Sequence, residues 1–217
     1  MDKVQKQLID TYFRKRNIAN NQDTQYEFES YEILYFINNN IPFDLSTLSS
    51  NTIAGILVKQ PSLINEFDLS KLSYYQITFI LKHQPQLFDY FDISKFDGYN
   101  IADLLIAQPL LIDKVNLSIL NDENITDILV AQPELINKFD FIIKSNWLVA
   151  NILIKQPSLI NYFDLSKFEN YQIAYIIENQ PTLINKIDLS RLNGEYISRI
   201  LLKQPELAKY FNNRNNG

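Results

Sequence analysis

The stretch Gln156-Pro-Ser-Leu-Ile-Asn-Tyr-Phe-Asp-Leu-Ser-Lys-Phe168 belongs to a pattern that runs through most of this 217-residue chain. Its Gln-Pro pair recurs every 24 residues without a slip. The seven glutamines are Gln60, Gln84, Gln108, Gln132, Gln156, Gln180 and Gln204. A fixed period of this length indicates one small structural unit copied end to end. Because one such unit cannot bury its apolar face alone, we expect the copies to stack and share a continuous core.

Each copy follows one consensus. Aligned on Gln-Pro, it reads Asp-Leu-Ser-Lys-Leu, four variable residues, and Ile-Ala-x-Ile-Leu-x-x-Gln-Pro-x-Leu-Ile-Asn-x-Phe. The seven copies span residues 44–67, 68–91, 92–115, 116–139, 140–163, 164–187 and 188–211. Residues 1–43 depart from the pattern and are predicted to form a helical N-terminal cap, with one helix around Val4 to Phe13 and another around Tyr31 to Ile37. Residues 212–217 are predicted to be a polar tail.

The longest periodic stretch of the unit has helical spacing. In the second copy Ile77, Ile80, Leu81 and Gln84 follow the i, i+3, i+4, i+7 pattern of one helical stripe. The position of Ser73 holds Asp97, Asn121, Ser145 and Asn193 in sister copies, and these residue types favour helix N-caps. A helix of ten or eleven residues is therefore predicted in every copy.

The proline divides the unit in two. A residue before proline is pushed out of the α region, so the longer helix is predicted to end at Gln84. Pro85 suits the first position of a second, shorter helix, and Asp92 then caps a short, 3-10-like turn. The prediction is an all-α fold, an α-solenoid of seven helix–short-helix repeats. The alternative is a β-solenoid or leucine-rich repeat with a strand at Asp-Leu-Ser, and the presence of only four glycines weighs against it.

Composition excludes several kinds of chemistry. The chain has no cysteine and one histidine, His83, so neither a thiolate nucleophile nor a Cys-based metal site is available. No Gly-rich phosphate loop and no Ser-His pairing is present, so we expect no enzyme, cofactor or metal. No apolar run approaches the length of a membrane span, which favours a cytoplasmic protein. The richness in Asn, Ile, Lys, Tyr and Phe is typical of A/T-rich genomes, such as those of low-GC bacteria, their phages or large viruses.

The copies from residue 44 to 211 resemble known repeats. Lys155-Gln-Pro-Ser-Leu-Ile-Asn-Tyr-Phe-Asp-Leu-Ser-Lys167 is similar to poorly characterised repeats of bacterial and phage proteins built on Gln-Pro-Gln-Phe-Ala-Asp-x-Cys-Asp-Trp-Ser-Lys-Leu. Leu replaces the Trp here, and Phe replaces the Cys. The length and helical plan also resemble the leucine-rich repeat variant family, whose Cys-bound iron–sulfur cluster has no counterpart in this chain. Both resemblances imply a repeat scaffold and no reaction.

Three polar columns are predicted to be structural. The glutamines lie on the apolar stripe and should form a hydrogen-bonded ladder, since a buried amide needs partners; the alternative is a row that contacts a ligand. The Asp of Asp-Leu-Ser is expected to cap its turn rather than to hold metal. A basic stripe is expected to be a solvated face, and the alternative is contact with phosphates of a nucleic acid. Its members are Lys59, Lys71, Lys95, Lys155, Lys167, Arg191 and Lys203.

Two features are candidates for partner binding. Variable residues spaced i, i+4 on the longer helices would align into a ridge when copies stack; they include Tyr75, Phe79, Tyr99, Asp103, Trp147, Asn151, Tyr171 and Tyr175. Ile119 and Ile143 replace Lys in two adjacent copies, close in sequence to the only tryptophan, Trp147. Exposed apolar patches of this kind mark partner sites. The alternatives are drift on a solvated face and a shifted turn that buries the two isoleucines.

The sequence thus predicts a non-enzymatic repeat scaffold that binds another protein. One specific version is a phage or viral inhibitor that blocks a host enzyme or defence complex. The alternative is a helical repeat protein that binds RNA or single-stranded nucleic acid, with tyrosines stacking on bases, although the net charge of −5 weighs against it. A structural spacer or self-associating array is a third possibility.

Overall fold

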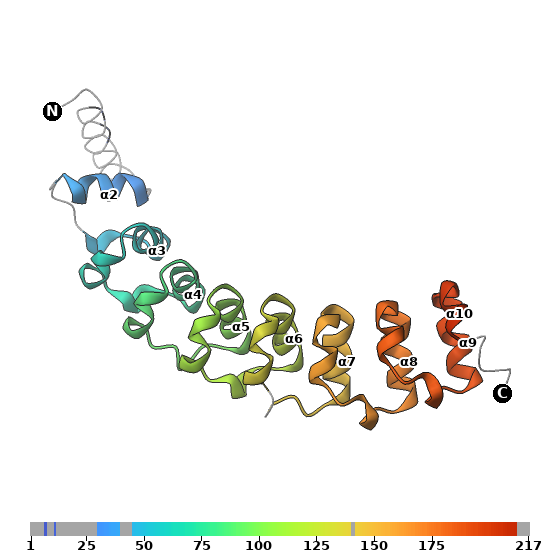
Figure 1. The fold of residues 1–217 in the computed structure, drawn as a ribbon. Coiled ribbons are helices and arrows are strands. Elements are labelled where there is room, and N and C mark those ends of the chain that lie inside the picture. The colour runs from blue at the N-terminus through green and yellow to red at the C-terminus, as the bar shows by residue number, and fades with distance from the viewer. Residues whose placement is uncertain (1–6, 8–10, 12–29, 40–44, 140–141, 212–217) are drawn as a thin grey trace. The chain divides into compact units, whose positions relative to one another are not determined.

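The computed structural model describes residues 7, 11, 30–39, 45–139 and 142–211, and it divides into two compact units, residues 1–96 and 97–217. Every regular element in this part of the chain is an α-helix or a 3-10 helix, and no strand occurs in it (Figure 1). The predicted all-α class is confirmed, and the strand-based alternative is wrong.

The first unit contains three described α-helices, α2 (Ser30–Asn38), α3 (Ser50–Lys59) and α4 (Tyr74–His83). Four 3-10 helices lie between or after them, η1 (Leu45–Thr47), η2 (Pro61–Glu66), η3 (Leu69–Lys71) and η4 (Pro85–Tyr90). Helix α2 packs on α3, and α3 packs on α4. Helix α2 matches the second predicted cap helix, whereas the first predicted cap helix lies outside the described residues except for positions 7 and 11.

The second unit repeats the same plan. Its α-helices are α5 (Gly98–Ala107), α6 (Asp122–Ala131), α7 (Asn146–Lys155), α8 (Asn170–Asn179), α9 (Gly194–Lys203) and α10 (Ala208–Phe211). Its 3-10 helices are η5 (Pro109–Lys114), η6 (Leu117–Ile119), η7 (Pro133–Lys138), η8 (Pro157–Tyr162), η9 (Leu165–Lys167), η10 (Pro181–Lys186), η11 (Leu189–Arg191) and η12 (Pro205–Leu207). From α5 to α9, each ten-residue helix packs against the next. The predicted tail, residues 212–217, lies outside the described residues.

The caps set where each ten-residue helix begins. The Ser73 side chain accepts a hydrogen bond from the backbone N–H of Gln76, whose own side chain bonds back to the Ser73 N–H, which makes a capping box. Asp97 and Asn121 form the same arrangement at the starts of α5 and α6. These bonds satisfy N–H groups that a helix leaves without partners at its first turn. The predicted N-caps are confirmed at these helices.

The Gln-Pro pair sets where each ten-residue helix ends. Gln84 follows the last residue of α4 and has left the α region, at φ −133° and ψ 68°. Pro85 opens η4, and the N–H of Leu87 bonds the Gln84 carbonyl at 3.0 Å, which starts the i→i+3 pattern. The shorter helix of the repeat is therefore a six-residue 3-10 helix, a geometry that proteins use in short pieces.

The core lies between successive ten-residue helices. Ile128 and Leu129 of α6 are completely buried, and the corresponding residues of α7, Ile152 and Leu153, are buried to the same extent. A small residue stands two positions before each such pair, and in the second unit Ala150 and others of its column are also buried. Small side chains at this place allow the neighbouring helices to approach closely.

Candidate protein-binding surface

In each ten-residue helix from α4 to α9 the second and sixth residues lie on one face, because side chains four positions apart are neighbours on a helix. We call these residues the helix ridge. Its members are Tyr75, Phe79, Tyr99, Asp103, Glu123, Asp127, Trp147, Asn151, Tyr171, Tyr175, Glu195 and Arg199. All are exposed except Tyr175, which is half-buried.

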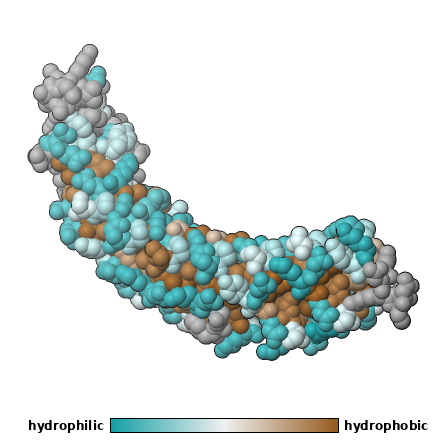
Figure 2. Space-filling view, viewed as in Figure 1, coloured by the Kyte–Doolittle hydropathy of each residue, from teal (hydrophilic) through white to brown (hydrophobic). Residues whose placement is uncertain are grey.

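Three aromatic ridge residues of α7 and α8 form a cluster in the second unit. The ring of Trp147 lies 5.8 Å from that of Tyr171 and 5.3 Å from that of Tyr175, the latter edge to face. Such spacings are favourable for aromatic pairs. Trp147 remains 44% exposed and Tyr171 41% exposed, so the cluster is open to solvent. We call Trp147, Tyr171 and Tyr175 the aromatic platform. Figure 2 shows hydrophobic side chains reaching the surface among hydrophilic ones.

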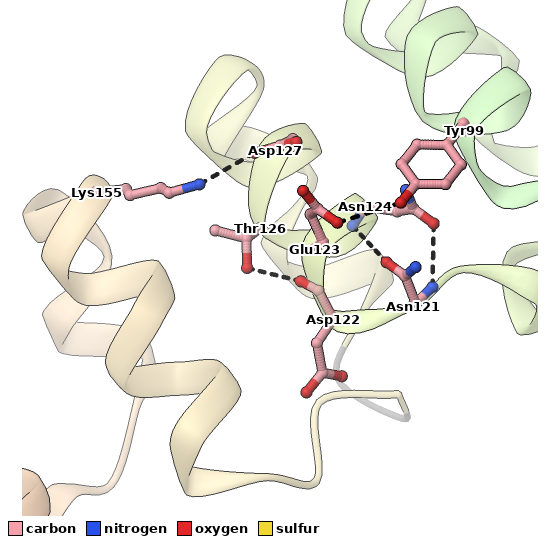
Figure 3. Close-up of polar contacts among 8 residues, drawn as sticks. All are labelled: Tyr99, Asn121, Asp122, Glu123, Asn124, Thr126, Asp127 and Lys155. Atoms are coloured by element: carbon pink, nitrogen blue, oxygen red, sulfur yellow. Dashed lines mark hydrogen bonds and ion pairs between the residues drawn. The ribbon is translucent and has the colours of Figure 1, made fainter.

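The α5–α6 part of the ridge is polar. The Tyr99 hydroxyl donates to Glu123 Oε2 at 3.3 Å, and Asp127 Oδ1 lies 3.2 Å from Lys155 Nζ on α7 (Figure 3). Tyr99 and Glu123 occupy the same column in adjacent copies, as do Trp147 and Tyr171. Contacts along this column therefore join α5 to α6 and α7 to α8.

The first unit carries Tyr75 and Phe79 on α4. Tyr75 is 76% exposed, and the Phe79 ring lies 4.7 Å from the ring of His83. The His83 Nδ1 atom is 2.8 Å from the Phe79 carbonyl oxygen, so this imidazole is tied to its own helix. Within the described ranges, no group of three His, Cys, Asp or Glu side chains is arranged to hold a metal ion.

The two isoleucines proposed as a patch lie on the turns rather than on the ten-residue helices. Ile119 ends η6 and is 41% exposed, whereas Ile143 is half-buried. The backbone differs at Phe139, which adopts helical angles, φ −106° and ψ −1°, where Phe163 is extended. The N–H groups of Ile142 and Ile143 both bond the Phe139 carbonyl. The described contacts thus place Trp147 with Tyr171 and Tyr175, and the isoleucines on separate elements.

The glutamine column links consecutive copies. The glutamine side-chain Nε2 donates to the backbone carbonyl of the penultimate residue of the preceding ten-residue helix. The pairs are Gln84–Val58, Gln132–Ile106, Gln156–Val130, Gln180–Ile154 and Gln204–Glu178. Carbonyls in the last turn of a helix have no partner within it. The glutamine amide supplies that partner across the copy boundary, which gives this column a structural role.

Most cations of the basic stripe have partners within the chain. Lys71 Nζ donates to the Ser46 carbonyl at 2.6 Å, and the Arg191 guanidinium donates to the carbonyls of Leu165, Ser166 and Phe168. These two turn cations therefore satisfy the backbone of the preceding turn, whereas Lys167 pairs with Asp164 of its own turn. Among the helix-end lysines, Lys59 bonds Ser30, Lys155 pairs with Asp127 and Lys203 pairs with Glu178.

The Asp-Leu-Ser turns are capped by their first residue. Asp68 Oδ1 accepts from the Ser70 N–H at 3.1 Å, and Asp164 Oδ1 accepts from the Ser166 N–H at 3.0 Å. The serine hydroxyl, and then its backbone N–H, hold the pKa of each carboxyl below its ordinary value. Asn116 makes the same bond to Ser118 at 3.1 Å without a charge. The predicted capping role is confirmed.

Sequence reasoning missed two carboxylates that are buried in the described residues, Glu32 and Glu178. Glu178 of α8 is only 5% exposed, with Oε1 2.9 Å from Arg199 Nη2 and Oε2 3.4 Å from Lys203 Nζ. Its column is otherwise mostly Val, Ile or Leu. The signal was available in the sequence: an acid replaces an apolar residue in one copy, and two cations stand in the next.

Comparison of the chain with models of known protein families, with curated protein sequences and with solved structures gave no match. The arrangement of successive helices defines the described chain as an α-helical repeat protein. In the described residues, no helix has the length and apolar content needed to cross a bilayer.

Proposed function

We propose that this chain is a non-enzymatic α-solenoid of seven repeats that binds another protein through the helix ridge. The observation that carries this proposal is the aromatic platform. Trp147 and Tyr171 keep more than a third of their surface exposed although each has an aromatic partner. Tryptophan and tyrosine are enriched at the energetic centres of protein interfaces. A scaffold of this kind would act by covering its partner, as an inhibitor of an enzyme or defence complex does.

The nucleic-acid alternative lacks comparable support. Phosphate binding needs free cations, and the cations that would form the stripe mostly bond carbonyls or carboxylates of this chain. The ridge itself carries Asp103, Glu123 and Asp127 between its aromatic residues. These carboxylates would repel a phosphate backbone.

Affinity capture with matched variants tests the proposal. The tagged wild-type chain is expected to retain a protein at a fixed stoichiometric ratio from a lysate of its native host. Trp147→Ala should lose that protein, because the central ring of the platform is removed. Tyr162→Ala is the control, since Tyr162 is an exposed aromatic residue on η8, outside the ridge. Equal retention by both variants would count against the ridge, and nucleic acid shed by salt would favour the alternative.

A further inference from the structure

The chemistry around the aromatic platform points to one kind of partner. We propose that the platform receives an arginine side chain of the bound protein, whose guanidinium lies on the Trp147 and Tyr171 rings and is attracted by the carboxylate of Glu123. This inference rests on the proposed function and specifies the partner that the same surface selects.

The first argument is the charge of the ridge in α5–α8. Its eight ridge residues include three carboxylates, Asp103, Glu123 and Asp127, and no cation. Lys155 stands beside this part of the ridge, but its ammonium group is engaged by Asp127 at 3.2 Å. Glu123 accepts from the Tyr99 hydroxyl, which is a neutral donor. Asp127 and Lys155 offset each other's charge, whereas Glu123, whose hydrogen-bond donor is neutral, keeps its negative charge in the column of Trp147 one copy earlier, which favours a cationic partner.

The second argument is that the cations of α9, which follows the platform helices α7 and α8, are paired with a carboxylate of this chain. Arg199 of α9 is a ridge residue, but its guanidinium lies 2.9 Å from the buried carboxylate of Glu178. Lys203 lies against the second oxygen of the same carboxylate. Both cations of α9 are thus held against the Glu178 carboxylate, which reduces their repulsion of a cation that approaches Trp147.

The third argument is the shape of the platform. Tyr175 meets the Trp147 ring edge to face, and the Tyr171 ring is tilted against it at 41°. Part of the surface of each exposed ring remains available to a ligand. Aromatic faces attract cations, and a planar guanidinium stacks on them while its N–H groups bond a carboxylate. An arginine uses both features of this surface, whereas a purely apolar side chain uses only one.

Selection from a library of random displayed peptides tests the inference with the full chain. Peptides are selected on the wild-type protein, and those that bind Trp147→Ala at least about tenfold more weakly are kept. Two further variants are then compared. Glu123→Gln removes the ridge carboxylate at the second position of α6, and Glu134→Gln removes an equal charge at the second position of η7, off the ridge.

The expected result is that the Trp147-dependent peptides are enriched in arginine and weakened roughly two- to fivefold by Glu123→Gln but not by Glu134→Gln. Two results would overturn the inference and leave the proposed function standing. The Trp147-dependent peptides could lack arginine enrichment, or Glu123→Gln and Glu134→Gln could change their affinity equally. A uridine oligonucleotide that binds at the platform more tightly than these peptides would also overturn it. If no peptide depends on Trp147, the proposed function fails and the inference fails with it.

Discussion

The inner and outer faces of α6, α7 and α8 follow opposite rules. On the inner face Ile128, Ile152 and Ile176 are completely buried, and the glutamine after each helix donates to the helix before it. On the outer face the second residue of the helix is Glu123, then Trp147, then Tyr171. Each of these helices packs against the one before it and the one after it, so its buried inner side chains must suit both neighbours and every copy needs the same residue type. An outer side chain has solvent on one side, and the same backbone can therefore present different chemistry there.

The largest test of this difference uses adjacent residues of α6. Ile128→Ala is expected to lower the free energy of unfolding by about 2–5 kcal/mol, because it leaves a cavity between packed helices. Asp127→Ala, on the outer face, should cost no more than about 1 kcal/mol, since it removes only an exposed ion pair. Urea denaturation of the two variants measures both values. If the two variants lost similar amounts of unfolding free energy, the inner and outer faces would not differ in their contribution to stability.

The glutamine column is the next test. Gln132→Ala is expected to cost about 1–3 kcal/mol, because the Ile106 carbonyl loses its partner across the copy boundary. The control is Glu134→Ala, an exposed residue two positions away. If Gln132→Ala and the control unfold at the same temperature, the amide contributes nothing to the stability of the stacked copies.

The helix caps should have a smaller effect. Asn121→Ala is expected to cost about 1 kcal/mol, because the Asn124 N–H loses the side-chain oxygen that accepts its hydrogen bond. Asn121→Asp keeps an acceptor in the same place, as Asp97 does at α5, and should retain most of the stability. Thermal melts of both variants check this, and equal losses would contradict a capping role.

Removing the central ring of the platform should abolish partner binding but lower the stability of the fold only slightly. Trp147→Ala is expected to lower the free energy of unfolding by less than Ile128→Ala does, about 0.5–1.5 kcal/mol, the contribution of an aromatic pair beyond burial of its area, because much of this side chain is already in solvent. Chemical denaturation followed by circular dichroism measures this, since the variant lacks the only tryptophan. A loss as large as that of Ile128→Ala would place Trp147 in the core and remove the distinction between the faces.

The smallest expected effect is a loss of stability at acid pH that arises in the Asp-Leu-Ser turns. The pKa of Asp164 is lowered in the folded chain by Ser166, so this carboxyl stabilises the fold above the ordinary aspartate pKa, and the contribution is lost as pH falls below it. Asp164→Asn copies the uncharged cap of Asn116. The difference in urea midpoint between wild type and Asp164→Asn should therefore narrow from pH 7 to pH 3. A difference that is constant with pH would contradict the lowered pKa.

Local rules made much of the fold predictable. The start of α4 at Ser73 and its end before Gln84 follow from residue preferences that act within a few positions. The all-α class follows from helical spacing repeated seven times. The 3-10 geometry of the shorter helix was not specified, because six residues with apolar pairs fit either helical type.

Contacts between copies were harder to predict. Sequence reasoning expected the glutamines to be hydrogen-bonded, but the acceptor in the preceding helix depends on how copies stack. Arg191 looked like a solvated cation, and only the structure shows its guanidinium on three carbonyls of the preceding turn. Spacing along the ridge predicted that Trp147 and Tyr171 share a face. Ile119 and Ile143 were expected on the turns of two adjacent copies, with a shifted turn that buries them as the alternative; Ile143 is half-buried, whereas Ile119 is exposed.

The most direct test of the central claim is the fluorescence of Trp147, the only tryptophan of the chain. A captured partner is titrated into the full chain. The partner either lacks tryptophan or is labelled so that its own emission falls at a different wavelength from that of Trp147. If the outer face binds the partner, Trp147 emission should shift to the blue and saturate at a fixed molar ratio as the indole loses contact with water. A complex that forms by sedimentation while Trp147 emission stays unchanged would contradict the claim that the ridge is the binding surface.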